Sequence, residues 1–363
     1  MPPVTQKQIA AALGLSQATV AAVLGNIPGI RMSAATRQRV LTAVARSGYR
    51  PARHARLMRG ARSGLLGLLQ YGGVPPTAGH SAALATQALL AGGYETVAGS
   101  VDWDGTGQPQ ALRTLLDLRV EGLLLLDPAR SIPAETLGLF KAQRIPIAAV
   151  NGWVVPEVVQ QRADVFRGMH ALARHVLETG RRRLVLLTFW PDSSRAEASC
   201  WPTLERVAGF RAGFTEAKAA LGCTATLQEI IWKSIPSGGD ACCRMGEDAL
   251  AGLLQWNSRP DAVICHNDSV AQGALKACAA RGLRVPEDLA ITGFGAEPAS
   301  GYGWVPLTSV AEPTEELVTQ AVARLLAMVR AGKVFDEPQI TRHACRLVIR
   351  ASSHRPTEWV GKK

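Results

Sequence analysis

The first 62 residues of this 363-residue chain contain ten Lys or Arg side chains and no Asp or Glu. The formal net charge of the whole chain is +11, so the other residues together carry only about +1. Such a cluster of cations can neutralise phosphate groups and makes binding to nucleic acid strongly dependent on salt. A solvated charged face or a disordered arm would have the same composition. The basic segment therefore indicates nucleic-acid binding only if it also folds into a nucleic-acid-binding motif.

Residue patterns that would support catalysis are missing from the sequence. No G-x-S-x-G, G-x-x-x-x-G-K-S/T, H-E-x-x-H or G-x-G-x-x-G motif occurs at a predicted strand–helix junction. His170 and His175 are five residues apart on one predicted helix, so they do not share a face as a metal pair would. The run Cys-His-Asn-Asp at 265–268 is adjacent in sequence, which is not the geometry of a nucleophile and its base. We expect no enzyme, no cofactor and no metal, and seven cysteines without C-x-x-C spacing should be reduced thiols.

The basic segment is predicted to form three short helices. Ile9 and Leu13 lie four apart in a helix-favouring run that ends at Gly14, which can take a positive φ. Ser16 is placed as the N-cap of a second helix over 17–24, and a third helix starts after Ser33. Two short helices joined by a glycine turn give a helix-turn-helix, whose second helix lies in the major groove. An ordinary three-helix bundle is the alternative.

Beyond residue 63, short apolar strands alternate with amphipathic helices. The candidate strands cover 65–69, 94–98, 120–126, 145–150, 183–188, 261–265 and 289–293. This alternation is typical of βαβ units with parallel sheets. No apolar stretch reaches the roughly 20 residues of a membrane span, and the first residues lack the apolar core of a signal peptide. We therefore expect a cytoplasmic protein that does not bind membranes.

Several motifs occur in the order found in one known family. Thr5, Gly14, the run Ser16-x-x-Thr19-Val20 and Tyr49-x-Pro51 resemble the lac repressor (LacI/GalR) family of bacterial transcriptional regulators. The resemblance continues through 65–69, 120–125, 206–210, 261–268, 285–294, 306–310 and 346–352. It implies an all-α helix-turn-helix domain and a hinge helix. An α/β two-lobed effector domain of the type I periplasmic-binding-protein-like (Rossmann-like) class would follow.

The resemblance also implies domain boundaries. The helix-turn-helix domain would cover 1–48, the hinge helix and linker 49–62, the effector domain 63–353 and a tail 354–363. The N-terminal lobe would comprise 63–162 and 294–322, and the C-terminal lobe 163–293 and 323–353, with crossovers near Ala163, Gly295 and Gln320. The tail is too short for a heptad-repeat helix, so we expect a homodimer on a pseudo-palindromic operator rather than a tetramer.

DNA contacts follow from the same resemblance. Hydroxyl groups match positions that contact phosphates at Ser16, Thr19, Ser33 and Thr36. Positions that read bases hold Gln17, Ala18 and Ala22. Gln17 can pair with adenine, whereas alanine offers only methyl contacts. Further DNA-contacting positions are Thr5, Tyr49, Arg53 and Ala55. Met58 stands where the family has a Leu that wedges into the minor groove, and Leu57 is the alternative.

The effector is implied to be a small molecule, a sugar or sugar derivative, bound between the lobes at the carboxyl ends of the strands. Polar ligand-binding positions match Asn151, Arg206 and Asn267, although each could instead make a structural hydrogen bond. Aromatic residues near the cleft are Tyr71, Trp153, Trp190 and Trp232, and a Trp there could stack on a sugar ring or pack inside a lobe. Gly295 replaces a usual acidic residue, and Glu312 could supply another carboxylate. A regulator or architectural protein that no longer senses a ligand is the alternative.

Overall fold

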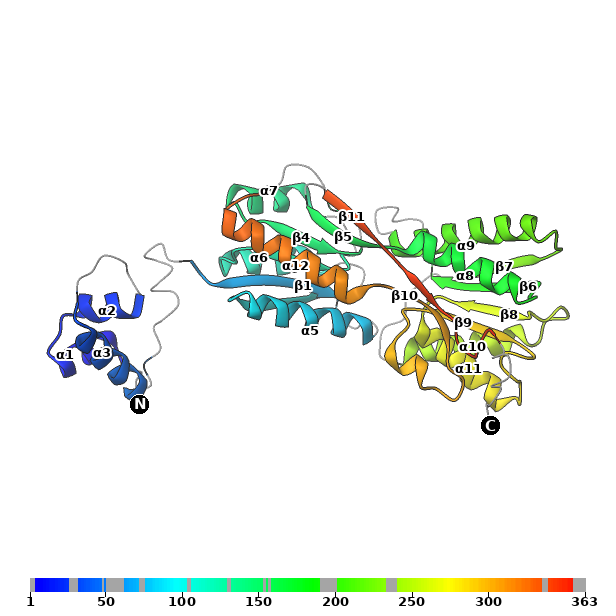
Figure 1. Cartoon of the computed structure of the whole chain (residues 1–363), viewed down its shortest axis with the longest axis horizontal. Helices are drawn as coiled ribbons and strands as arrows, with labels where there is room; N and C mark the ends of the chain where they lie inside the picture. Colours follow the sequence, from blue (N-terminus) through cyan, green and yellow to red (C-terminus); the bar gives the residue numbers. More distant parts are fainter. Residues whose placement is uncertain are drawn as a thin grey trace, which may run out of the picture. The chain divides into compact units, whose positions relative to one another are not determined.

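The chain forms two compact units, Met1–Gly64 and Leu65–Lys363 (Figure 1). The computed structural model describes residues 4–25, 32–47, 49, 62–71, 76–102, 106–128, 132–152, 155, 158–189, 201–232, 240–334 and 339–354. Each unit has its own hydrophobic core. The two are therefore described separately.

The N-terminal unit consists of three helices, α1 (Gln6–Leu13), α2 (Gln17–Gly25) and α3 (Ala34–Ser47). Ile9, Val20, Val23 and Val40 are buried together and join the three helices. Gly14 ends α1 with a φ of 64°, and its N–H donates to the carbonyls of the preceding turn. A side chain at this φ would be strained, so glycine permits the tight turn into α2.

The second unit contains two lobes, each built on a six-stranded sheet. The N-terminal lobe has the strand order β11-β5-β4-β3-β1-β2, with all pairings parallel. Its strands are β1 (Leu65–Tyr71), β2 (Glu95–Val101), β3 (Leu123–Leu126), β4 (Ile147–Val150), β5 (Val159–Asp164) and β11 (Gln339–Ala344). Strands β3 and β4 are fully buried because helices cover both faces of the sheet. One face carries α5 (Pro76–Ala91) and α12 (Thr314–Ala331), and the other carries α6 (Gln108–Asp117) and α7 (Ala134–Ala142).

The C-terminal lobe has the strand order β12-β10-β9-β8-β6-β7. Its strands are β6 (Arg183–Phe189), β7 (Thr226–Trp232), β8 (Ala262–Cys265), β9 (Ala290–Phe294), β10 (Thr308–Ala311) and β12 (Arg346–Val348). Strand β12 pairs antiparallel with β10, and the other pairings are parallel. One face packs against α8 (Val165–Glu178) and α9 (Trp201–Ala220), and the other against α10 (Ala241–Leu253) and α11 (Asp268–Ala280). The short 3-10 helix η2 (Pro298–Gly301) follows β9.

Two of the three expected crossovers between the lobes were wrong. The first crossing, where β5 ends at Asp164 and α8 begins, lies beside the expected Ala163. The chain does not leave the C-terminal lobe at Gly295, because β10 pairs with both β9 and β12. It leaves after β10, when α12 buries Leu317 and Leu325 on the N-terminal lobe. The chain does not return to the C-terminal lobe at Gln320, because the later strand β11 still pairs with β5 of the N-terminal lobe. The return comes between β11 and β12.

Among the described residues, no single helix is long and apolar enough to cross a membrane. Helices α1 and α2 pass the same test only as a bent pair, with an angle of 112° between them.

Candidate functional site

The N-termini of α2 and α3 share one capping arrangement. The Thr19 N–H donates to Ser16 Oγ (3.0 Å), and the Thr36 N–H donates to Ser33 Oγ (3.1 Å). The two hydroxyls of each pair also lie within hydrogen-bond distance, at 2.8 and 2.9 Å. The four predicted phosphate-contacting hydroxyls therefore lie at two helix N-termini. The backbone N–H groups and the helix dipole there favour anions.

The surface of α2 begins with exposed Ser16, Gln17 and Ala18, which suits a helix whose first residues face bases. The base contact expected from Ala22 is wrong, because this side chain is only 4% exposed. Residue 22 lies on the inner side of α2, next to the buried Val23.

The remaining predicted DNA contacts have mixed outcomes. Thr5 is the N-cap of α1, and its hydroxyl accepts from the Gln8 N–H in a capping box. Tyr49 is half-buried and packs against the core of the N-terminal unit. The predicted contacts Arg53, Ala55 and Met58, with the alternative Leu57, lie outside the described residues.

The C-terminal lobe presents an aromatic row at the carboxyl ends of four neighbouring strands. Trp232 ends β7 and packs on Phe189, which ends β6, with ring centroids 5.1 Å apart. Phe189 makes an edge-to-face contact of 4.7 Å with His266, which follows β8. Phe294 ends β9 and lies beneath the Arg206 guanidinium, whose central carbon is 3.6 Å from the ring centroid. Such cation–π stacking fixes the plane of the guanidinium.

Arg206, from α9, is held by His266 as well as by Phe294. Its Nη1 donates to the His266 carbonyl (3.0 Å) and lies 3.2 Å from His266 Nε2. Burial, and then the Arg206 charge, hold the pKa of His266 well below its usual value. The imidazole is therefore neutral at pH 7, so Nε2 can accept from Arg206 while Nδ1 donates to Thr188 Oγ1 (3.3 Å). Arg206 is thus oriented before any ligand arrives.

The N-terminal lobe contributes carboxyl and amide groups at the ends of β3 and β4. Asp127 and Asn151 follow these strands with φ of 50° and 49°, in the left-handed region. Burial, and then the Glu312 carboxylate, raise the pKa of Asp127 from 3.8 to about 7, although Arg206 opposes the shift. Burial also raises the pKa of Glu312, again opposed by Arg206. Asp127, Glu312 and Arg206 therefore interact electrostatically across the two lobes.

Two predicted ligand-binding amides have structural hydrogen bonds. Asn151 Oδ1 accepts from the Ala163 N–H (2.8 Å), and its Nδ2 donates to Glu312 (3.3 Å). Asn267 is the N-cap of α11, where its Oδ1 accepts from the Val270 N–H (2.9 Å). The structural alternative stated for each amide therefore applies.

The other predicted cleft residues lie as follows. Trp232 packs within the aromatic row, and Gly295 has a φ of 119° while its N–H donates to Val310 (2.8 Å). The backbone of Tyr71 ends β1, whereas Trp153 and Trp190 lie outside the described residues. Asp127 was not among the predicted ligand-binding residues, although its place directly after a buried strand was a usable signal.

Comparisons with known proteins agree with this architecture. Residues 173–353 match the model of the periplasmic binding protein-like domain. The HTH-type transcriptional regulator DegA of Bacillus subtilis is 27% identical, covering 85% of this chain and 86% of DegA. The ribose operon repressor of Haemophilus influenzae is also 27% identical, with 90% and 92% covered. The crystal structure of the lac repressor dimer bound to operator and the anti-inducer ONPF has a TM-score of 0.76 at 22% identity, covering 97% of this chain and 99% of that one.

Over most of its length this chain is thus similar to transcriptional regulators and to the lac repressor in particular. The predicted fold class, a helix-turn-helix unit followed by a two-lobed α/β domain, is confirmed. The protein is a DNA-binding transcriptional regulator, and its relatives in these comparisons are regulators rather than enzymes.

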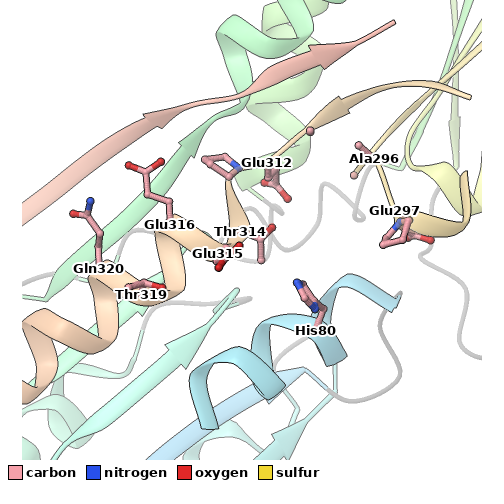
Figure 2. A pocket seen from close by; sticks show the side chains of 13 residues that line it. His80, Ala296, Glu297, Glu312, Thr314, Glu315, Glu316, Thr319 and Gln320 are labelled. Carbon is pink, nitrogen blue, oxygen red and sulfur yellow. The ribbon is translucent and has the colours of Figure 1, made fainter. Parts of the chain in front are cut away.

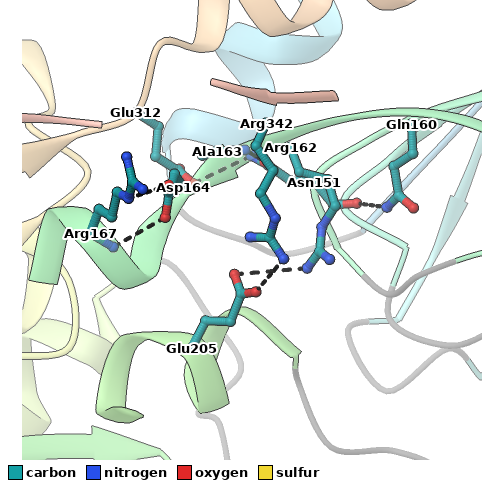
Figure 3. A network of polar contacts seen from close by, with 9 residues as sticks. All are labelled: Asn151, Gln160, Arg162, Ala163, Asp164, Arg167, Glu205, Glu312 and Arg342. Atoms are coloured by element: carbon teal, nitrogen blue, oxygen red, sulfur yellow. Dashed lines mark hydrogen bonds and ion pairs between the residues drawn. The ribbon is translucent and has the colours of Figure 1, made fainter. Parts of the chain in front are cut away.

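An ion network joins the two lobes (Figure 3). Glu205, which precedes Arg206 on α9, lies 3.0 Å from Arg342 of β11 and 4.0 Å from Arg162 of β5. The Arg162 side chain is 3% exposed, whereas that of Arg342 is 44% exposed. Burial lowers the pKa of Arg162, and Glu205 opposes the shift. A carboxylate from one lobe thus neutralises two arginines from the two neighbouring strands of the other.

Proposed function

We propose that this regulator is a repressor that binds a pseudo-palindromic operator as a homodimer and is controlled by a sugar or sugar derivative bound between its lobes. The observation that carries the proposal is the meeting of Arg206, Asp127 and Glu312 at the strand ends. Ligands of open α/β sheets bind outside the carboxyl ends of the strands. The name of one relative, the ribose operon repressor, supports a sugar as the ligand class.

The DNA-binding part of the proposal rests on α2. Gln17 leads the exposed start of this helix and would read a base, while the capped N-termini of α2 and α3 bind phosphates. One such short helix reads few bases, so two copies related by two-fold symmetry are needed for useful affinity. Met58 from each copy would insert into the central minor groove. The protein would act in the cytoplasm, where the DNA lies.

Ligand control follows from the contact between the lobes. A ligand that touches Arg206 and Asp127 binds the closed arrangement of the lobes more tightly than the open one, so it shifts the population toward closure. Closure would change how the N-terminal lobes of two copies meet, and so order or melt the hinge helices.

The test begins by selecting an operator from random DNA with the full-length protein. Sugars, sugar acids, sugar phosphates, polyols and purines are then screened for a rise in melting temperature, because binding to the native state stabilises it. A ligand found in this way should change operator affinity at least tenfold. The Arg206→Ala variant should lose this response, and Arg174→Ala, on the exposed surface of α8, should keep it. Retention of the response by Arg206→Ala would contradict the proposed site.

A second variant tests the reading helix. Gln17→Ala should change the preferred operator at one base pair in each half-site, while Gln255→Ala, exposed after α10, should not. An unchanged preference in Gln17→Ala would show that α2 does not read the operator through this side chain.

Gly295 favours a second candidate, a DNA-binding protein without a ligand, because this position lacks the usual carboxylate. Operator binding that no compound alters would support it.

A further inference from the structure

A pocket of about 870 Å³ has a lining that is rich in carboxyl groups and includes Glu312. Figure 2 shows Glu312, Glu315 and Glu316 around the start of α12, with Glu297 and His80 on other sides of the pocket. The volume lies within the range of pockets that enclose small molecules. An acidic lining alone would not identify a ligand, because exposed carboxylates such as Glu315 are simply solvated.

Glu297 differs from these surface carboxylates because it is buried and unpaired. The residue is only 8% exposed, and no hydrogen bond or ion pair of its carboxyl group occurs in the described part of the chain. Its backbone is held firmly, since its N–H donates to Asp268 Oδ2 (2.8 Å) and its carbonyl accepts from Ser300 Oγ (2.6 Å). Asp268 is itself bound by the Ser309 hydroxyl (2.6 Å) and supplies no positive charge. The fold therefore fixes at the pocket wall a carboxyl group that has no partner among the described residues.

Asp127 is a further carboxyl group close enough to Glu312 for the Glu312 charge to raise its pKa. It is half-buried, and its carboxyl group also has no hydrogen bond or ion pair with the described residues. Glu312 itself accepts one hydrogen bond, from Asn151. The cation that acts on Asp127 and Glu312 is Arg206, which is already bound to His266 and stacked on Phe294. Asp127 and Glu312 thus adjoin one arginine that is already engaged, and Glu297 has only the Asp268 carboxyl group as its charged neighbour.

This excess of carboxyl groups is unfavourable in the ligand-free protein. Burial of a carboxylate without a counter-charge disfavours its ionised form. Burial, and then the Asp268 charge, raise the pKa of Glu297 to about 7, close to the value of Asp127. A neutral sugar would leave this repulsion in place, because hydroxyl groups carry no charge. A cationic group would remove it.

We propose that the effector of this regulator carries a positively charged amine, as an amino sugar does, and that Glu297, with Glu312 of the same pocket lining, binds this amine. The inference rests on the ligand control proposed above. Glu297 then replaces the carboxylate that is lacking at Gly295, two residues earlier, and selects a charge rather than a hydroxyl pattern.

The first test compares matched ligands on the full-length protein by calorimetry and operator binding at pH 7. D-Glucosamine, D-galactosamine and D-mannosamine are each compared with the parent hexose and the uncharged N-acetyl derivative. At least one amine should bind ten times more tightly than both of its neutral relatives and alter operator affinity. A neutral member that binds equally or better would overturn the inference but leave the ligand-controlled repressor intact. Silence of every member, with intact operator binding, would overturn the inference, whereas ligand control itself is decided by the wider screen described above.

The second test asks whether Glu297 itself recognises the charge. Glu297→Gln should weaken binding of the amine at least tenfold and change binding of its N-acetyl derivative less than twofold. Asp117→Asn, at the exposed end of α6, should change neither. Amine binding to the wild type should also strengthen from pH 5.5 to 7, as the carboxyl groups ionise. Equal losses for both ligands in Glu297→Gln would assign this residue a structural role and overturn the inference.

Discussion

The substitution Glu205→Gln should destabilise the two-lobed unit more than the removal of any exposed charge on α8 or α9. The substitution keeps the size of the side chain but removes the charge that faces Arg162 and Arg342. Both arginines belong to the N-terminal lobe, whereas Glu205 belongs to α9 of the other lobe. The loss therefore falls on the contact between lobes.

The magnitude follows from the burial of each partner. At the 4.0 Å between Arg162 Nη2 and Glu205 Oε2, two unit charges attract by about 4 kcal/mol at an effective dielectric constant of about 20. Removing one partner of a buried pair typically costs about 3–5 kcal/mol, and Arg162 keeps other interactions, so we expect roughly 2–4 kcal/mol. The half-exposed Arg342 pair adds less than about 1 kcal/mol. For a unit of this size, the melting temperature should fall by about 3–6 °C.

Differential scanning calorimetry of the full-length protein measures this change. Glu216→Gln is the matched control, because Glu216 pairs with His170 between α8 and α9 but is 69% exposed, and it should shift the melting temperature by about 1 °C or less. The melting temperature of Arg342→Gln should lie between those of Glu205→Gln and Glu216→Gln. A Glu205→Gln protein that melts within 1 °C of wild type, or no lower than Arg342→Gln, would refute the assignment of the energy to the buried Arg162 contact.

Three further predictions concern the C-terminal lobe. Gly273→Ala should cost about 3 kcal/mol or more by urea denaturation, because its Cβ would lie 1.8 Å from the Cys243 carbonyl, whereas Gly252→Ala has open space and should be neutral or stabilising. Asp268→Asn should lower the melting temperature, since it loses a charged acceptor of three hydrogen bonds, at roughly 2–4 kcal/mol; an unchanged value would contradict this role. Glu297→Gln should be more stable than wild type at pH 8 by about 1–3 kcal/mol and equal to it at pH 4, because the folded state binds this proton more tightly than the unfolded chain between pH 4.5 and 7. Parallel stability curves for the two proteins would contradict the last prediction.

The helix-turn-helix was predictable from the sequence because its signals are local. The positive φ of Gly14 and the caps at Ser16 and Ser33 depend only on residues within one turn of the helix. Ala22 was misplaced because its burial depends on how three helices pack, which a position within one helix does not reveal.

The strand ends were predictable, but their assignment to sheets was not. The alternation of strands and helices gives no signal for which lobe receives β10 or β11, so two crossovers were wrong. Strand β11 is also polar and mostly exposed, and it lacks the apolar run that marks its neighbours. The same limit hid Asp127 and Glu297, whose unusual surroundings arise only when segments far apart in sequence meet.

The three crossings between the lobes bear on how the protein is made. The sheet of the N-terminal lobe needs β11 at its edge, and that of the C-terminal lobe needs β12, only one residue further along the chain. A nascent chain that leaves the ribosome has therefore assembled most of both sheets while neither is complete. The two lobes are therefore completed together, when residues 339–348 are added. A premature stop codon before residue 339 would remove the last strand of both lobes at once, so the cell would have no half-length product with one intact lobe to compete with the complete regulator.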